Sequence, residues 1–168
     1  MALIGGNIET PRELFLHELG AALTTEKTVL DMLPQLEEHA HDSQLKQSLR
    51  AHYEETQWHV GNVERAFEAL GADVDETSCP AIEGLEKETQ ANLKMVDDSL
   101  NDNVVVAGVI GTEHHEIALY EGLVTSAEAM GEQDVAALLQ EILENEQTTL
   151  QEAKRMSQQL AQRAVQAA

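Results

Sequence analysis

The sequence predicts an all-α protein: a bundle of four long helices, with a short additional helix in the connection between the second and the third. Alanine, leucine, glutamate and glutamine are abundant, which favours helix, while aromatic residues make up only 3% of the chain. Apolar residues recur every three or four positions through four long segments. The 168 residues are enough for one domain with a buried core.

The first helix has a clear start signal. Thr10 can cap it, Pro11 suits the first helical position, and Glu13 stands three positions after the cap, as in a capping box. Pro34 lies within the apolar pattern and is expected to kink the helix rather than end it. The helix is expected to end near residues 39–41.

The later elements follow from caps and breakers. Asp42 or Ser43 can cap the second helix, which is expected to stop at Gly71. Residues 71–79 are predicted to be a loop, and a shorter helix is expected to open at Cys79 and Pro80. The remaining predicted elements are the end of this short helix near Val96, a turn at 97–103, a third long helix ending near Gly131, and a fourth at 133–162.

Connection lengths predict how these helices pair. Short connections make the first and second long helices antiparallel neighbours, and likewise the third and fourth. The second and third are separated by a long crossover, of the kind found in ferritin-like bundles. The predicted organisation is an N-terminal arm at 1–9 followed by a ferritin-like four-helix bundle at 10–165.

The chain is strongly acidic. It has 10 Lys and Arg against 31 Asp and Glu, a formal net charge of −21. This charge disfavours nucleic acid and anionic membranes as partners, and no apolar run is long enough to span a bilayer. It fits attraction of cations, life in high salt, or a solvated acidic surface. The single cysteine, Cys79, and the lack of signal-peptide features favour the cytoplasm.

Glutamates interrupt the apolar face of every long helix near its middle. The mostly apolar stretch 104–124 holds Glu113 and Glu116, which lie three positions apart and therefore on one helical face. An ionised carboxylate is costly to bury unless it is paired or binds a cation. Either these faces are solvated, or a cation lies among them. The corresponding glutamates of the other three helices are Glu26, Glu55 and Glu146.

This glutamate pattern predicts two divalent metal ions inside the bundle. Iron or manganese suits carboxylates joined by an imidazole, whereas oxygen ligands alone also suit calcium or magnesium. Ferritin-like di-metal centres take a Glu from each of two helices and a Glu-x-x-His from each of the other two, and such ligands suit iron or manganese. The chain matches this scheme in part. Glu55 has His59 four positions later instead of three. Thr149 stands where a histidine would follow Glu146, and Glu116 is an additional carboxylate that can replace it.

Some neighbouring residues are candidates for supporting roles. Tyr120 lies four positions after Glu116, so its hydroxyl can contact a ligand carboxylate or serve a radical path; the alternative is a packed tyrosine. His52 and His114 are candidates for orienting the ligands. Helix-breaking glycines that are expected to permit close helix approach are Gly108, Gly111 and Gly122.

Five stretches match a known family in order and residue type: LTTEKTVLDMLPQL, HYEETQWHVGNVERAFEALG, CPAIEGL, EHHEIALYEGLVTSAEAMG and LLQEILENEQTTL. From about Thr10 to Met156, the chain resembles the YciE/YciF-type ferritin-like stress proteins. The resemblance implies a rubrerythrin-like bundle, a homodimer and a di-iron-type site. Because family members often have glutamine where His59 stands, a supporting role for His59 stays open. The ligands that the resemblance implies are Glu26, Glu55, Glu113, Glu116 and Glu146, with His59 as a further candidate.

The residues and the resemblance together predict a carboxylate-bridged di-metal protein. It would react with peroxide or O₂ in a stress response, as an oxidoreductase of peroxidase or ferroxidase type. The competing hypothesis is a non-enzymatic structural protein, in which the metal only holds the bundle together or is absent.

Overall fold

The protein is all-α, as the sequence predicts. The computed structural model describes residues 7–167, and within this range it contains helices and no strand. The helices are α1 (Pro11–His39), α2 (Ser43–Ala69), α3 (Pro80–Met95), a 3-10 helix η1 (Asp98–Leu100), α4 (Asn101–Met130) and α5 (Gln133–Ala167).

Local capping explains where α1 and α2 begin and where α4 ends. The Thr10 hydroxyl accepts the Glu13 N–H at 3.1 Å, and the Glu13 carboxylate accepts the Thr10 N–H at 2.9 Å, which confirms the predicted capping box. Asp42 caps α2 by accepting two backbone N–H groups of its first turn. Gly131 follows α4 with a φ of 78°, a left-handed conformation that suits glycine. Pro34 lies within α1 and does not end it.

The helical segments are longer than predicted in two places. The expected turn at 97–103 is instead occupied by η1 and by the first turn of α4, which begins at Asn101. Asp97 caps η1 by accepting the Ser99 N–H, and α4 starts at Asn101 without a side-chain cap. At the other end, α5 continues to Ala167. Within the predicted N-terminal arm, residues 1–6 lie outside the described residues, and residues 7–9 are not helical.

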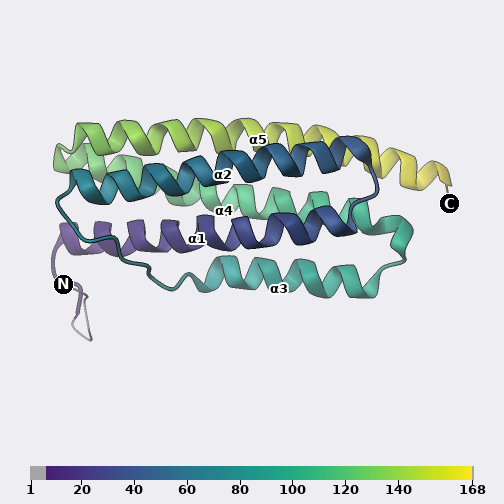
Figure 1. Cartoon of the computed structure of the whole chain (residues 1–168), viewed down its shortest axis with the longest axis horizontal. Coiled ribbons are helices and arrows are strands. Elements are labelled where there is room, and N and C mark those ends of the chain that lie inside the picture. The colour runs from purple at the N-terminus through teal and green to yellow at the C-terminus, as the bar shows by residue number, and fades with distance from the viewer. Residues whose placement is uncertain (1–6, 168) are drawn as a thin grey trace.

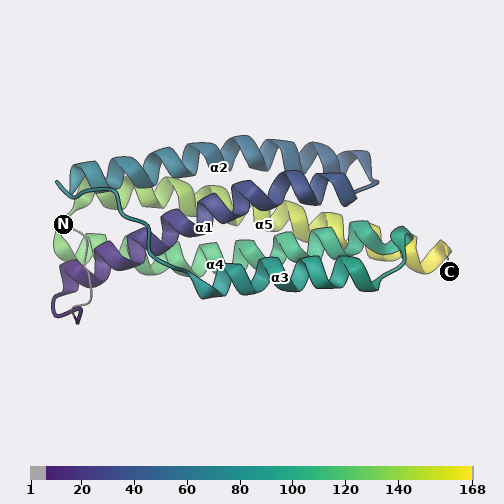
Figure 2. The same ribbon diagram turned by 60° about the horizontal axis from the view of Figure 1, so that its bottom comes forward.

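Four long helices lie alongside one another, and α3 covers one flank (Figures 1 and 2). α1 packs on α2 and α4 packs on α5, each pair forming an antiparallel hairpin with a short connection. The two hairpins meet because α1 also packs on α4 and α2 on α5. α3 packs mainly on α4 and less extensively on α1, so it lies in the crossover between the hairpins.

The connection between α2 and α3 crosses closely over α1. A Cβ atom at Gly20 of α1 would lie only 2.8 Å from the backbone carbonyl oxygen of Asp75, so this crossing requires a glycine. The start of the connection is also fixed, because Arg12 Nη2 donates to the Leu70 carbonyl oxygen at 2.6 Å. The crossover is therefore held against α1.

Of the three α4 glycines expected to permit close helix approach, one does so. A Cβ at Gly108 would lie 2.8 Å from the side chain of Thr89 on α3, so the prediction is confirmed there. At Gly111 the nearest atom would be a Leu85 methyl carbon at 3.5 Å, an ordinary contact. At Gly122 nothing lies within 4 Å, so the prediction is wrong for that residue.

The apolar core consists of two separate clusters. One cluster joins the first half of α1 and the second half of α2 to the hairpin end of α4 and α5; it includes Phe15, Phe67, Tyr120 and Leu139. The other joins the opposite halves of these helices with α3; it includes Leu33, Leu49, Ile82 and Val106. Between the two lies a layer of buried polar side chains, among them glutamates and histidines.

Within residues 7–167, no helix carries an apolar stretch of the length and hydropathy needed to cross a lipid bilayer.

Candidate metal centre

The polar layer collects carboxylates and imidazoles from four helices. Helical spacing explains why α2 and α4 each contribute two side chains to the layer. Residues three positions apart on α4, and seven positions apart on α2, lie on the same face of their helix. Each glutamate in the layer is 0% exposed, so none is a surface group. The layer contains Glu26 of α1, His52 and His59 of α2, Glu113 and Glu116 of α4, and Glu146 of α5.

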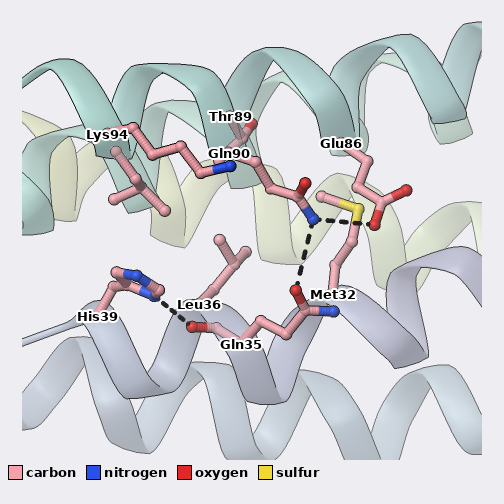
Figure 3. Close-up of a pocket in the computed structure, with 9 residues that line it drawn as sticks. Met32, Gln35, Leu36, His39, Glu86, Thr89, Gln90 and Lys94 are labelled. Atoms are coloured by element: carbon pink, nitrogen blue, oxygen red, sulfur yellow. Dashed lines mark hydrogen bonds between the residues drawn. The ribbon is translucent and has the colours of Figure 1, made fainter.

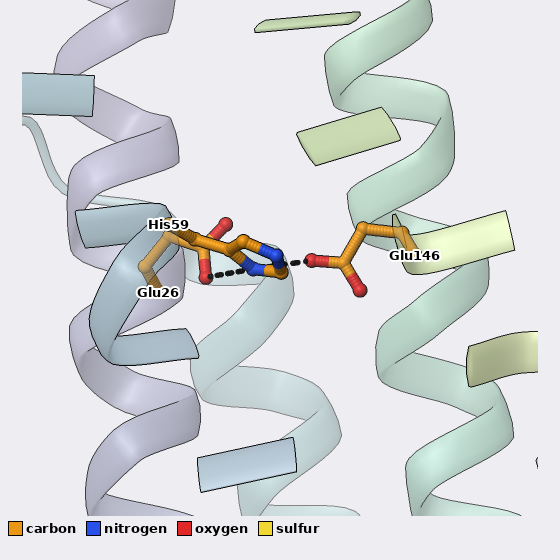
Figure 4. A group of neighbouring side chains, drawn as sticks. All are labelled: Glu26, His59 and Glu146. Atoms are coloured by element: carbon orange, nitrogen blue, oxygen red, sulfur yellow. Dashed lines mark ion pairs between the residues drawn. The ribbon is translucent and has the colours of Figure 1, made fainter. Parts of the chain in front are cut away.

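One cluster in this layer is formed by Glu26, His59 and Glu146 (Figure 4). His59 Nδ1 lies 3.0 Å from Glu146 Oε1 and 3.4 Å from Glu26 Oε2, so the imidazole stands between the two carboxylates. Its other nitrogen, Nε2, lies 3.0 Å from Asn145 Oδ1, to which it donates in the tautomer that leaves Nδ1 free. No role for Asn145 was predicted from the sequence, in which it directly precedes Glu146.

Glu146 also belongs to a second cluster, with His52 and Glu113. His52 Nε2 lies 3.2 Å from Glu113 Oε1, and one potential ligand atom from each of the three residues lies within 4.8 Å of the others. Glu146 is therefore shared by both clusters. Glu116 is buried in the same layer, outside these two groups of three.

Most carboxylate oxygens of the layer lack a hydrogen-bond donor. An unsatisfied buried polar atom costs about 1–3 kcal/mol, and a charged one costs more. Within the described part of the chain, the buried atoms of the layer without a hydrogen-bond partner are Glu26 Oε2, both carboxylate oxygens of Glu113, Glu116 and Glu146, His52 Nε2 and His59 Nδ1. The layer is thus rich in unused electron-pair donors that face one another.

Burial and mutual repulsion shift the pKa values of these glutamates. Burial raises the pKa of Glu113 and of Glu116 well above the ordinary value, and the negative charge of Glu146 raises both further. Burial also raises the pKa of Glu26. Burial acts in the same direction on Glu146, but its contact with His59 outweighs this and lowers its pKa.

The two histidines respond in opposite ways. Burial alone would lower the pKa of His59, but the contacts with Glu146 and Glu26 raise it to about 10. For His52, burial dominates and lowers the pKa to about 4. In the absence of a metal, His59 is therefore the cation of the layer and His52 is neutral near pH 7.

Tyr120 lies beside the layer and is fully buried. Its hydroxyl donates a hydrogen bond to Glu26 Oε1. Burial raises its pKa well above the ordinary value, and the charge of Glu26 raises it further, so the phenol keeps its proton. The hydroxyl thus contacts a candidate ligand carboxylate.

Other residues singled out in the sequence lie further from the layer. Glu55 is half-buried at the edge of α2, in a groove that it shares with Thr149 of α5, and it belongs to neither cluster. His114 is exposed, so the orienting role expected for it is wrong. His115 is half-buried, and its Nε2 lies 3.5 Å from the sulfur of Cys79.

A separate crevice of about 110 Å³ lies between α1 and α3 (Figure 3). Gln90 Nε2 donates to Gln35 Oε1 at 3.4 Å across it, and His39 Nδ1 contacts the Gln35 carbonyl oxygen at 2.8 Å. None of the residues that line this crevice belongs to the polar layer. It therefore gives no access to the carboxylates.

Comparison with known proteins identifies the family. Residues 10–166 match the family model described as a domain of unknown function, DUF892. The chain belongs to the DUF892 family. The Escherichia coli (strain K12) protein YciF is 30% identical over 145 residues, which cover 85% of this chain and 87% of YciF. The resemblance to YciF-type proteins is thereby confirmed.

Solved structures agree with this DUF892 assignment. The crystal structure of the E. coli stress protein YciF has a TM-score of 0.87 and 27% identity, covering 92% of this chain and 99% of YciF. YcfI of Rhodopseudomonas palustris has a TM-score of 0.86 and 31% identity, covering 90% of this chain and 98% of its own. A protein from Xanthomonas campestris pv. campestris has a TM-score of 0.76 and 25% identity, covering 94% and 98%.

The polar layer of this DUF892 protein contains two overlapping groups of buried carboxylates and imidazoles that could hold a metal ion. Its four buried glutamates carry four negative charges when ionised, which two divalent cations would balance. Carboxylate oxygens together with imidazole nitrogens are ligands that iron and manganese accept. The bond to Asn145 holds His59 with Nδ1 toward the carboxylates, as hydrogen-bonded partners hold ligand histidines in metal sites.

Proposed function

We propose that this protein is a ferritin-like four-helix bundle, with α3 as the extra helix of its crossover, that holds two divalent metal ions in the polar layer. Iron is the favoured metal and manganese the alternative. The observation that carries the proposal is the convergence of four fully buried carboxylates whose oxygens mostly lack hydrogen-bond donors. Burying such carboxylates in their ionised form is costly unless a cation binds them.

The proposed ligands are the residues of the two clusters and the remaining buried glutamate. Glu146 belongs to both clusters, so its carboxylate would help to hold both metals. Glu55 stays a ligand prediction of the sequence, but its half-buried position at the edge of the layer supports this role less well. The proposed ligand set is Glu26, His52, His59, Glu113, Glu116 and Glu146.

We propose that the centre reacts with peroxide or O₂ in a stress response, which makes the protein an oxidoreductase of peroxidase or ferroxidase type. The metals would supply one-electron steps between their 2+ and 3+ states. In support, the relative YciF is described as a stress protein. A homodimer is the proposed assembly, by the family resemblance.

The surrounding residues have defined tasks in this proposal. Asn145 orients His59 by accepting from its Nε2, which keeps Nδ1 directed at Glu146 and Glu26. Tyr120 donates to Glu26 and so holds one carboxylate in place. The two apolar clusters on either side exclude water from the layer, which strengthens the electrostatic interactions inside it.

The test is the metal content of protein purified without added metal or chelator, measured by elemental analysis. We expect about two iron or manganese ions per chain, in line with a two-metal site, and loss of metal in Glu26→Ala and Glu113→Ala. Glu54→Ala is the matched control, because Glu54 is exposed on α2. Peroxide consumption with and without added Fe²⁺ then tests the reaction. Full metal occupancy and oxidant turnover in Glu113→Ala would refute the ligand assignment.

A second candidate function is purely structural, and one observation favours it. Protonated His59 between Glu26 and Glu146 neutralises part of the layer without any metal. The description of the relative YcfI also proposes that it is a structural protein. Absence of transition metal from the purified protein, with unchanged thermal stability in the Glu26→Ala and Glu113→Ala variants, would support this alternative.

A further inference from the structure

A groove of about 420 Å³ runs between α2 and α5 on the outside of the bundle. Polar residues of both helices line it, and its acidic members are Glu55 on α2 and Glu152 on α5. Glu55 is half-buried and Glu152 is exposed, so the two carboxylates extend from the surface toward the interior. Both carboxylates line the same groove, so they lie near each other at its surface end.

The inner end of this groove reaches the polar layer. His52 lines the groove, and it also lines a smaller hollow beneath, together with Val106 and Val109 of α4. Ser48 and Thr149 line both spaces, so the smaller hollow continues the groove inward.

His52 links this path to the carboxylates. It is 3% exposed, and its Nε2 has no hydrogen-bond partner although it lies 3.2 Å from Glu113 Oε1. A buried, unpartnered imidazole nitrogen thus stands between the groove and the first carboxylate of the layer. By contrast, the crevice between α1 and α3 has no lining residue in the layer.

We propose that the groove between α2 and α5 is the route by which divalent cations reach the polar layer, and that Glu55 and Glu152 form a transient cation site at its mouth. This inference rests on the proposed function, since it supplies the same centre. A partly dehydrated cation would pass from Glu152 to Glu55, then past Thr149 to His52 and Glu113. Each step exchanges one oxygen or nitrogen ligand for the next and changes no oxidation state.

Charge explains why such a mouth would matter. A cleft lined by one sign of charge concentrates counter-ions and speeds their association by about tenfold or more at low ionic strength. The net charge of −21 attracts cations to the whole surface. Glu55 and Glu152 would concentrate them at the mouth of the groove, where they enter. Arg155 also lines the groove and opposes cations there, so its charge should slow their passage.

The test is the rate at which metal-free, full-length protein binds Co²⁺, followed by stopped-flow visible absorption at low ionic strength. We expect the double variant Glu55→Gln/Glu152→Gln to bind about tenfold more slowly, with the same final absorbance and equilibrium affinity. Ser48→Phe, which narrows the inner end, should also slow binding without changing the end point. Arg155→Gln should speed binding.

The matched control is Glu54→Gln/Glu141→Gln, which removes the same two charges from the same two helices. Glu54 is exposed and faces the other side of α2, where it lines a hollow shared with α1, and Glu141 is exposed on α5. Neither lines the groove. The control should bind Co²⁺ at the rate of the wild type, because neither of its glutamates lines the groove; equal slowing of both double variants would indicate a general charge effect and overturn the route.

The outcomes separate this inference from the proposed function. Normal Co²⁺ occupancy with unchanged rates in both the double variant and Ser48→Phe would overturn the route but not the centre. A lower final occupancy in Glu55→Gln/Glu152→Gln would overturn the transient role and make Glu55 a ligand. Failure of the wild type to bind Co²⁺ at equilibrium would overturn the proposed centre, and the route with it.

Discussion

Replacing Glu113 by glutamine should make the metal-free protein more stable. Glu113 is 0% exposed and neither of its oxygens has a hydrogen-bond partner. Burial, reinforced by the charge of Glu146, raises its pKa well above the ordinary 4.5. Near neutral pH, folding of the metal-free chain must therefore protonate this carboxyl or bury it charged. Glutamine has the same shape, carries no charge and can donate to Glu146.

The size of the effect follows from the pH. Keeping a carboxyl of ordinary pKa 4.5 protonated costs about 1.4 kcal/mol for each pH unit between that value and its raised pKa, which is at most about 3 kcal/mol at pH 7. Imperfect hydrogen bonding of the buried amide in the variant offsets about 1 kcal/mol of this. The expected net gain in the free energy of unfolding is therefore at most about 2 kcal/mol, which corresponds to a rise in Tm of no more than about 8 °C for a chain of this length.

The assay is thermal denaturation in chelator, followed by far-UV circular dichroism, with Glu141→Gln as the exposed control on α5. Because the folded-state pKa is raised, the carboxyl costs nothing below its unfolded pKa and costs progressively more as the pH rises. The advantage of Glu113→Gln should therefore vanish near about pH 4.5 and grow toward neutrality. The same variant should lose metal. The reasoning is refuted if Glu113→Gln is no more stable than the wild type at neutral pH, or if its advantage does not depend on pH.

Three further predictions follow from the layer and its surroundings. Tyr120→Phe removes the donor to Glu26 and should cost about 1.5–3 kcal/mol in the metal-free protein, measured by urea unfolding, because hydrogen bonds to charged groups are strong. Gly20→Ala should destabilise the protein by about 1–3 kcal/mol, since its Cβ would meet the crossing backbone. Gly122→Ala, which meets nothing, should stabilise it by up to about 1 kcal/mol, and equal effects of the two substitutions would contradict this reading. The pKa of His59 is raised to about 10, so its stabilising contribution is fully present below about pH 6.5 and is lost as the pH rises through about 10. Chemical denaturation of metal-free His59→Gln across this window should show a smaller loss of stability with rising pH than the wild type, and a parallel loss would count against an imidazolium in the layer.

The helices were predictable because their signals are local. Thr10 and Glu13 form their capping box within one turn, and Asp42 and Gly131 act on the chain next to them. The turn predicted at 97–103 was wrong because polar residues favour both turns and helix starts. Only the packing of α4 decides whether such a segment is a turn or the start of a helix.

The site could be predicted only in part from the sequence. Helical spacing brings Glu113 and Glu116 to one face, and both are buried. The same spacing leaves Glu55 half-buried at the edge of the α2 face, where it lines the groove between α2 and α5. The contact of His59 with Asn145 joins residues 86 positions apart, so only the packing of α2 on α5 reveals it.

The division of the core into two apolar clusters has a consequence for the alignment of the helices. Uniform apolar faces can slide past one another at little cost, and a single buried polar position is known to fix the register of a helical assembly. Here every long helix places a polar group at the same level of the bundle. Moving α1 by one turn, about 5.4 Å, would carry Glu26 away from His59 and Tyr120 into an apolar cluster. Burying that carboxylate without a partner would be costly. The polar layer therefore fixes the axial position of each long helix relative to its neighbours.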